Sequence, residues 1–293
     1  MGDSCRDPYA QDSSLKIEGD SVHKRLNILV RYLCLLILAA IFVGPFYWLL
    51  VTSLSGSGDI YAFPPRLFPS HLTFHNYVEV WQAVPMARFF LNTVIIVFFG
   101  TTLTLFLSAL AGYPLARMDF PGKKLIFIVL LATLMLPEEG LLIINFLTCS
   151  RLGLTNTYLG VFLPSIASVF GIILLRQAYL SIPKEIEDAA RIDGCGHFSL
   201  WWRIMLPLVS PALATLAVFA FVAYWNSFLW PLIILKDTKM YPLSVGLTWL
   251  SGTFSTNFRL VAAGSVLAML PTLVIFLMLQ RYFVKGITAG MGK

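Results

Sequence analysis

The sequence predicts an all-α integral membrane protein with six transmembrane helices, and three observations support this prediction. The chain has 293 residues, of which 58% are hydrophobic and only 12% are charged. Soluble domains carry about 25% charged residues, so this composition is typical of a membrane protein. Six apolar runs are each long enough to cross about 30 Å of hydrocarbon. Lysine and arginine gather in alternate connections between these runs, as expected of a chain that crosses the membrane repeatedly.

The chain divides into a polar N-terminal tail and one membrane domain. We expect residues 1–26 to be a disordered cytoplasmic tail, because they carry five acids and show no apolar period. These acids also argue against a cleaved signal peptide. The membrane domain should cover residues 27–293. Its predicted spans cover residues 32–51, 89–113, 125–147, 158–175, 208–235 and 260–284.

The distribution of basic residues predicts the orientation of the chain. With six spans, both termini lie on the same side of the membrane. That side would hold fifteen lysines and arginines, and the opposite side would hold six. The positive-inside rule therefore makes both termini cytoplasmic. The same rule places residues 181–207, which connect the fourth and fifth spans, in the cytoplasm.

Residues 181–207 form the one long mixed polar and apolar segment between two strongly hydrophobic runs. We expect Ser181 to cap a first helix, with acids early in the helix where its positive end favours them. Gly194 is placed to end this helix in a left-handed turn. A second, short amphipathic helix should follow, with apolar residues at spacings of three and four: Phe198, Trp201 and Met205.

The spacing within this segment resembles the EAA loop of ABC-importer permease subunits, whose motif is E-A-A-x3-G-x9-I-x-L-P. Seven fixed positions fall within twenty residues, and all match except the first, where Asp188 replaces Glu. In that family the loop is a coupling helix that docks into a cleft on a separate ATP-hydrolysing subunit. The resemblance implies docking by Glu187, Asp188, Ala189, Ala190, Arg191, Asp193, Gly194, Ile204, Leu206 and Pro207.

Other stretches are similar to carbohydrate-uptake members of that family, of the maltose-transporter type with six spans. Residues 152–160 resemble the stretch before their fourth span, and residues 224–228 resemble their W-N-E-F segment, with Ser227 where Glu is common. The C-terminal stretch 280–290 is similar to their tail. The resemblance implies the architecture of a type I (MetI-like) importer permease. It also implies a C-terminal contact with the ATPase through Gly286, Thr288, Ala289 and Gly290.

The resemblance further implies the partners of the chain. These are a homologous second permease subunit, two ATP-binding subunits, an extracytoplasmic solute-binding protein and the lipid bilayer of a bacterial inner membrane, without nucleic acid. The sequence has no G-x-x-x-x-G-K-[ST] phosphate loop and no metal-ligand cluster. We therefore expect no cofactor on this chain, ATP and Mg on the partner subunits, and no enzymatic activity of its own. The transported solute would be a di- or oligosaccharide, a glycosylglycerol or glycerol phosphate.

The alternative is a self-sufficient secondary transporter or channel. Such proteins are often built from internal repeats, and charged residues within their spans mark the transport path. The sequence shows neither repeats nor charged residues paired across spans. Both observations favour the importer subunit.

Glu138 and Glu139 fall about halfway along the third predicted span, between Pro137 and Gly140. A carboxylate facing lipid at mid-depth costs about 2.5–3.5 kcal/mol on insertion scales. We therefore expect the pair to face the bundle interior or a wet cavity. Two roles remain open: lining the substrate path, or bracing a break in the helix.

Tyr224, Trp225 and Asn226 lie near the middle of the fifth predicted span. Aromatic faces stack on sugar rings and an amide can bond sugar hydroxyls, so these residues are candidates for the substrate path. The other interpretation is packing against a neighbouring span.

Overall fold

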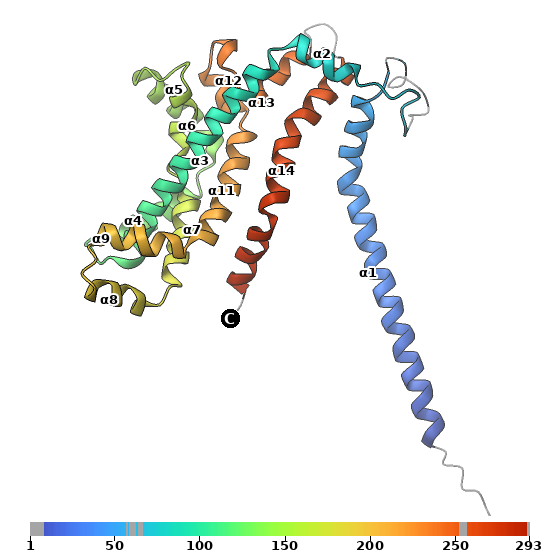
Figure 1. The fold of residues 1–293 in the computed structure, drawn as a ribbon, viewed down its shortest axis with the longest axis horizontal. Helices are drawn as coiled ribbons and strands as arrows, with labels where there is room; N and C mark the ends of the chain where they lie inside the picture. Colours follow the sequence, from blue (N-terminus) through green and yellow to red (C-terminus); the bar gives the residue numbers. More distant parts are fainter. Residues whose placement is uncertain (1–8, 57, 59–62, 64–66, 252–256, 292–293) are drawn as a thin grey trace, which may run out of the picture. The chain divides into compact units, whose positions relative to one another are not determined.

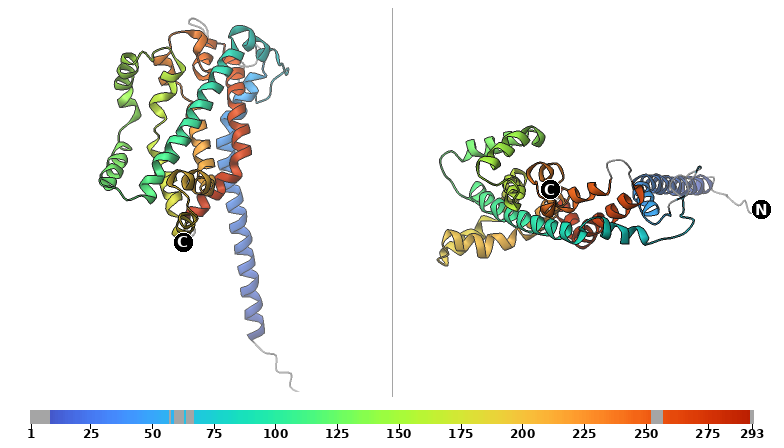
Figure 2. Two further views of the ribbon diagram at one scale, coloured as in Figure 1. Left: turned by 60° about the vertical axis from the view of Figure 1, so that its left-hand side comes forward. Right: turned by 90° about the horizontal axis from the view of Figure 1, so that it is seen from above.

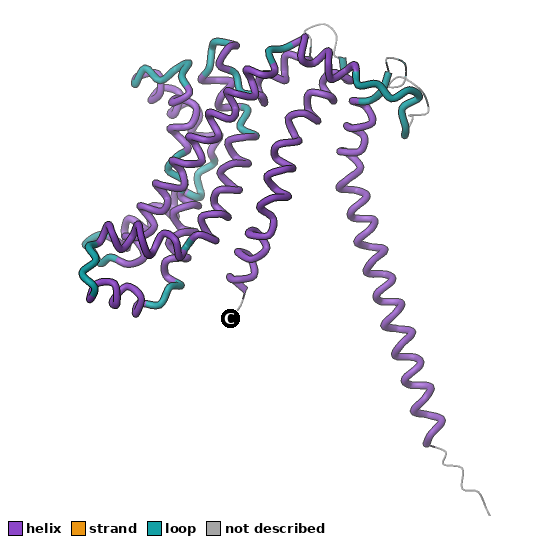
Figure 3. The backbone as a smooth tube through the Cα atoms, in the orientation of Figure 1, coloured by secondary structure: helices purple, strands orange, loops and turns teal. Residues whose placement is uncertain are grey.

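The computed structural model describes residues 9–56, 58, 63, 67–251 and 257–291, and leaves the side chains of residues 9–26, 138 and 279–291 outside the description. The described residues form helices and loops, without strands (Figure 3). The chain divides into two compact units, residues 1–72 and residues 73–293. Each unit is described by itself.

The first unit consists of helix α1 (Tyr9–Ser53) and the residues that follow it (Figure 1). Residues 27–53 of α1 are long and apolar enough to cross a membrane. The helix begins at Tyr9, so the prediction of a disordered tail is wrong for residues 9–26. Between Tyr9 and Gly44, Gly19 is the sole glycine or proline, and a helix nucleated in the apolar part can propagate cooperatively through residues without a breaker.

The second unit is a helical bundle with long helices along its axis and short helices at both ends (Figures 1 and 2). Its elements, in order, are α2 (His75–Ala83), α3 (Met86–Arg117), α4 (Lys123–Thr133), η1 (Glu138–Leu141), α5 (Leu142–Arg151), α6 (Tyr158–Phe162), η2 (Leu163–Ser165), α7 (Val169–Leu180), α8 (Lys184–Ile192), α9 (His197–Leu200), η3 (Trp201–Met205), α10 (Leu206–Leu208), α11 (Ser210–Trp225), α12 (Leu229–Ile234), η4 (Thr238–Met240), α13 (Leu243–Gly246), η5 (Leu247–Leu250) and α14 (Phe258–Met291).

Helices fall on all six predicted spans, but three of the spans are not single straight helices. Among the described residues, α1, α3 and α14 are each long and apolar enough to cross a membrane. The fourth span is α6–η2 followed by α7, bent by 50°. The fifth begins with α11, which is bent by 76° from the helix over residues 197–208. Pro164 and Pro211 lie in or beside these bends, where proline removes a backbone donor.

The third predicted span, residues 125–147, is broken into α4, η1 and α5. Figure 2 shows α4 and α5 stacked one beyond the other along the length of α3. Pro137 has an extended backbone, with ψ 131°, and a short 3-10 turn over residues 138–141 follows it. Proline disfavours helical backbone at the residue before it, which explains why the continuous span expected here does not form.

Two hydrophobic cores hold the bundle together, one toward each end. The first contains Val80, Phe89, Trp225 and Ala263, and the second contains Tyr113, Leu175, Tyr179, Leu200 and Met205. Helix α3 contributes its N-terminal half to the first core and its C-terminal half to the second. The second core therefore joins the membrane helices to residues 184–209.

The close approach of α3 and α7 depends on a small residue. A Cβ atom added to Gly112 would lie 3.2 Å from the backbone oxygen of Ile172 and 3.2 Å from the backbone nitrogen of Arg176. Small residues let membrane helices approach backbone to backbone, which strengthens their packing without a hydrophobic driving force. This contact sets the ends of α3 and α7 side by side.

Candidate coupling surface and substrate cavity

Residues 184–208 form a helix, a turn and a second helix at the end of the bundle where α7 ends (Figure 1). We name this segment the coupling unit. Helix α8 begins at Lys184 with Pro183 as its N-cap residue. The prediction that Ser181 caps this helix is wrong, because Ser181 is the C-cap residue of α7 and its hydroxyl donates to the carbonyl of Ala178 at 2.8 Å. The proline at 183 moves the helix start past the expected serine.

Gly194 has a φ of +80°, which confirms the predicted left-handed turn after α8. Its amide donates to the carbonyl of Arg191 at 3.0 Å, and the amide of Cys195 donates to the carbonyl of Ala190 at 3.0 Å. A Cβ atom at Gly194 would meet nothing within 4 Å. The requirement for glycine is therefore one of backbone conformation and not of space.

Helix α8 has a buried face and an exposed face. Glu187 and Ala190, one turn apart, are buried against the bundle. Five of the ten predicted docking residues are exposed on α8 or in the turn that follows it: Asp188, Ala189, Arg191, Asp193 and Gly194. Ile192 adds an apolar side chain that is 86% exposed. Large exposed apolar side chains on one patch are typical of surfaces that bind a partner.

Arg117, the last residue of α3, ties α8 to the membrane helices. Its guanidinium donates to the carbonyl of Tyr179 at 2.7 Å and 3.1 Å and also to the carbonyl of Ile182. Its Nε lies 3.9 Å from Oε2 of Glu187. Both side chains are more than nine-tenths buried. The planar guanidinium can bind several acceptors at once, so one side chain fixes α3, the end of α7 and α8 together.

We name the contacts of Arg117 with Tyr179, Ile182 and Glu187 the clamp. Buried aromatic residues pack around it. The hydroxyl of Tyr113 lies 3.4 Å from Oε1 of Glu187, which also accepts a bond of 2.8 Å from Arg191. The indole of Trp201 donates to the hydroxyl of Tyr179 at 3.1 Å. Tyr113 and Tyr179 pack edge to face with centroids 5.5 Å apart. Both helices of the coupling unit are thus bonded to the ends of α3 and α7.

The second helix of the coupling unit contains a π-helical turn at Trp201–Met205. Leu200, Trp201 and Met205 are buried, whereas Phe198 is 68% exposed. Trp201 and Met205 therefore face the bundle as expected, and Leu200 takes the buried place expected for Phe198. A π turn adds a residue to the helical turn, which shifts the apolar face. Of the remaining predicted docking residues, Ile204 and Leu206 are half-buried and Pro207 is exposed.

Tyr224 lies in the packed interior. Its ring is buried, and its hydroxyl lies 3.2 Å from the hydroxyl of Thr104 and 3.4 Å from the carbonyl of Phe162. These contacts support the packing interpretation for Tyr224.

Trp225 and Asn226 border a cavity of about 280 Å³ between the end of α11, α13–η5 and α14. The indole of Trp225 donates to the carbonyl of Ala268 at 3.0 Å. Four other polar side chains line the cavity: Asn226, Ser244, Ser265 and Thr272. Within the described part of the chain, the hydroxyl of Ser244 donates to the carbonyl of Ser227 at 2.6 Å, and the side chains of the other three residues form no hydrogen bond. Polar groups at membrane depth need partners, so this cavity is suited to water or to a hydroxylated ligand.

Glu139 is exposed on the chain, at the break between α4 and α5. Glu139 therefore does not face the interior of this chain's own bundle, because the extended residue Pro137 turns the chain out of the helix; the alternative, that it faces a wet cavity, stays a prediction. The side chain of Glu138 lies outside the description. Since a carboxylate facing lipid is costly, the surface that carries Glu139 should face water or another protein.

The predicted C-terminal contact residues, Gly286, Thr288, Ala289 and Gly290, fall within α14. Their side chains are outside the described residues.

An all-helical membrane chain that presents an exposed coupling helix at one end has the features of a transport permease. The chain belongs to the family described as binding-protein-dependent transport system inner membrane component, whose model matches residues 66–289. It is therefore a permease subunit of an ABC importer and not a self-sufficient channel. This confirms the resemblance stated from the motif.

Curated relatives and a solved structure agree with this assignment. An arabinooligosaccharides transport system permease protein, AraQ, of Bacillus subtilis is 36% identical over 87% of this chain and 92% of its own length. A melibiose/raffinose/stachyose import permease protein, MelC, of the same species is 33% identical over 90% of this chain and 96% of its own length. A chain of a bacterial ABC transporter that imports the acidic polysaccharide alginate has the same fold. Its TM-score is 0.81 at 24% identity, over 89% of this chain and 98% of that chain.

Proposed function

We propose that this subunit forms half of a translocation pathway for a sugar or sugar-like solute, together with a homologous second permease. The single observation that carries the proposal is the coupling unit, whose motif residues lie on an exposed face that Arg117 fixes to the membrane helices. The sugar-import names of two relatives support the solute class. The candidates are a di- or oligosaccharide, a glycosylglycerol and glycerol phosphate.

In this proposal, two ATP-binding subunits hold ATP and Mg, and each permease inserts its coupling unit into a cleft on one of them. Closure of these subunits around ATP would pull the coupling units together. The clamp of Arg117 would pass this movement to α3 and α7, because all three elements share one guanidinium. The pathway would then change from inward-open to outward-open, since nucleotide shifts the equilibrium only through differential binding to the two states. An extracytoplasmic binding protein would deliver the solute.

We assign the polar cavity at Asn226 and Thr272 to the substrate path. Trp225 borders the cavity but is buried, with its ring stacked on Phe221, so sugar hydroxyls would be bound by the side chains of Asn226, Ser265 and Thr272. The cavity lies toward the end of the bundle opposite the coupling unit, as α12 and α13 do in Figure 1. A solute from outside the cell would meet it before the coupling end.

Thr272→Val should lower sugar uptake by the assembled transporter at limiting loaded binding protein by about 2- to 12-fold. Valine keeps the shape of threonine and removes one hydrogen bond, which contributes about 0.5–1.5 kcal/mol. The measurement is ATP-driven uptake of labelled sugar into proteoliposomes. Thr215→Val is the matched control, because Thr215 is bonded to the carbonyl of Pro211 away from the cavity. If Thr272→Val and Thr215→Val gave equal uptake, the cavity would not be part of the substrate path.

We further propose that both termini and the coupling unit are cytoplasmic. A cysteine at Asp188, which is exposed on α8, should resist a membrane-impermeant thiol reagent in intact cells and react after the cells are opened. A cysteine at Thr238, in η4 at the other end of the bundle, should react in intact cells. Labelling of position 188 from outside would reverse the orientation and exclude docking to a cytoplasmic ATPase.

A further inference from the structure

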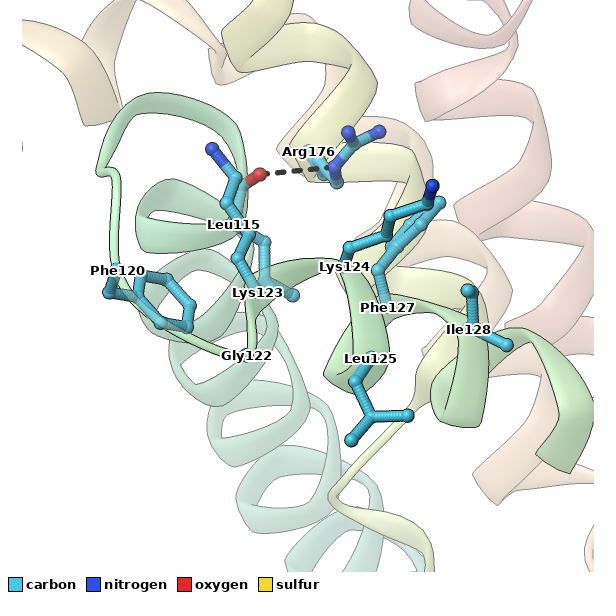
Figure 4. Close-up of a pocket in the computed structure, with 9 residues that line it drawn as sticks. All are labelled: Leu115, Phe120, Gly122, Lys123, Lys124, Leu125, Phe127, Ile128 and Arg176. Carbon is cyan, nitrogen blue, oxygen red and sulfur yellow. Dashed lines mark hydrogen bonds between the residues drawn. The ribbon is translucent and has the colours of Figure 1, made fainter.

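A groove of about 690 Å³ lies beside the coupling end of the bundle, between the end of α3, the first turns of α4 and α7 (Figure 4). It is separate from the docking face of α8 and from the polar cavity. Three basic residues border it: Lys123, Lys124 and Arg176. Its other side chains are apolar and include Leu125, Phe127 and Ile128.

The apolar part of the groove is open. Leu125 is 66% exposed and Ile128 is 51% exposed, and helix α4 has no residue buried within the chain. The groove lies at the ends of α3 and α7, which belong to segments apolar enough to cross a membrane, so we expect it to lie at the boundary between hydrocarbon and water. Its occupant must therefore be largely apolar.

The three basic side chains lie together at the rim of the groove. Arg176 is held in place by a bond from its Nε to the carbonyl of Leu115 at 3.1 Å, and its guanidinium carbon lies 4.1 Å from the Phe127 ring centroid. Lys123 donates to the carbonyl of Met118 at 2.7 Å and lies 3.5 Å from the fully exposed carboxylate of Asp119. The ammonium group of Lys124 forms no hydrogen bond with the other lining residues (Figure 4). Three cations thus share one rim with a single exposed acid.

We propose that this groove binds one anionic phospholipid, with its phosphate on Lys123, Lys124 and Arg176 and an acyl chain along Leu125 and Ile128. Basic pockets between membrane helices at the cytoplasmic face are suited to anionic headgroups, and each nearby lysine or arginine adds attraction. A soluble anion would leave the apolar floor uncovered. A protein partner would have to supply acids to all three cations.

The test places benzoylphenylalanine at Ile128 in the assembled transporter, in bilayers of equal parts phosphatidylglycerol and phosphatidylcholine. After irradiation, mass spectrometry identifies the lipid bonded to the residue. We expect phosphatidylglycerol adducts to exceed phosphatidylcholine adducts by at least about fivefold, and Lys124→Gln to lower this ratio by about fivefold. Lys184→Gln, at the exposed start of α8, should leave the ratio unchanged.

A second probe position controls for the general attraction of anionic lipid to a basic surface. Val129 is the next residue of α4, is 53% exposed and does not line the groove. A probe at Val129 should therefore give equal amounts of phosphatidylglycerol and phosphatidylcholine adducts. Equal amounts of phosphatidylglycerol and phosphatidylcholine adducts at Ile128 would overturn the proposal. So would a ratio of the two adducts that Lys124→Gln leaves unchanged. Adducts with the second permease alone would assign the groove to that subunit. Loss of selectivity in excess inorganic phosphate would assign it to a soluble anion.

Discussion

We expect Arg117→Ala to abolish substrate-stimulated ATP hydrolysis while the subunit still inserts into the membrane. The substitution leaves the carbonyls of Tyr179 and Ile182 without their shared donor and removes one of the two cations that pair with the carboxylate of Glu187. Loss of one partner of a buried ion pair costs about 3–5 kcal/mol. Since these contacts hold α8 to α3 and α7, the coupling unit should lose its fixed orientation. The measurements are pull-down of the ATPase subunit and hydrolysis stimulated by loaded binding protein.

Two variants separate this effect from a simple loss of charge. Arg191→Ala removes a cation that bonds the same carboxylate at 2.8 Å, but this side chain is 48% exposed and, among the residues that the structure describes, bonds no other element. Because Arg191 is also a predicted docking residue, its loss should weaken pull-down of the ATPase, and hydrolysis by the complex that does assemble should still respond to substrate. Arg117→Lys keeps the charge but cannot reach both carbonyls with one planar group, so it should remain defective. Wild-type coupling in Arg117→Lys would show that charge alone is needed and that the clamp geometry is not.

Gly194→Val should change the orientation of the two helices of the coupling unit relative to each other. At a φ of +80°, an L-residue is strained by about 1–2 kcal/mol, and a β-branched residue by more. The chain would relax by changing the angle between α8 and the helix over residues 197–208. We expect loss of ATPase association, or an intact complex whose hydrolysis no longer responds to substrate.

The surroundings of Gly194 allow a sharp control. Because an added Cβ meets nothing within 4 Å, size alone should not matter. Asparagine tolerates the left-handed region, so Gly194→Asn should keep most of the coupling. Gly196 is two residues away, has equally open space and an ordinary φ of −68°, so Gly196→Val should be close to wild type. If Gly194→Val matched Gly196→Val in association, stimulated hydrolysis and uptake, the turn would not shape the coupling surface.

Local features of the sequence predicted much of the coupling unit. Gly194 follows an amphipathic stretch and has the left-handed conformation expected of it. The buried face of α8 could not be predicted in the same way. Glu187 is a predicted docking residue, but the structure buries it against the bundle. Its partner Arg117 lies seventy residues earlier, and no periodicity in the sequence connects an acid on one helix with a base at the end of another. Only the packing of α3 against α7 brings them together.

The third span shows a second limit of the pattern. Hydropathy identified residues 125–147 as apolar enough to cross, and Pro137 marked the interruption. A kinked helix and two separate helices have the same composition. They differ in how far Pro137 turns the chain, and composition does not determine this. The turn also decides where Glu139 lies, and the structure places it on the exposed surface.

We propose that the exposed face of the coupling unit binds an ATP-hydrolysing subunit. The direct test is cross-linking from a single cysteine at Ile192, the apolar residue that is 86% exposed on α8, in an assembled transporter whose other cysteines are replaced. A cysteine at Leu152, 64% exposed at the opposite end of the bundle, is the control. A bifunctional reagent should join position 192, and not position 152, to the ATPase subunit, with a yield that changes on ATP binding. An actively transporting complex without a cross-link from position 192 would contradict the account.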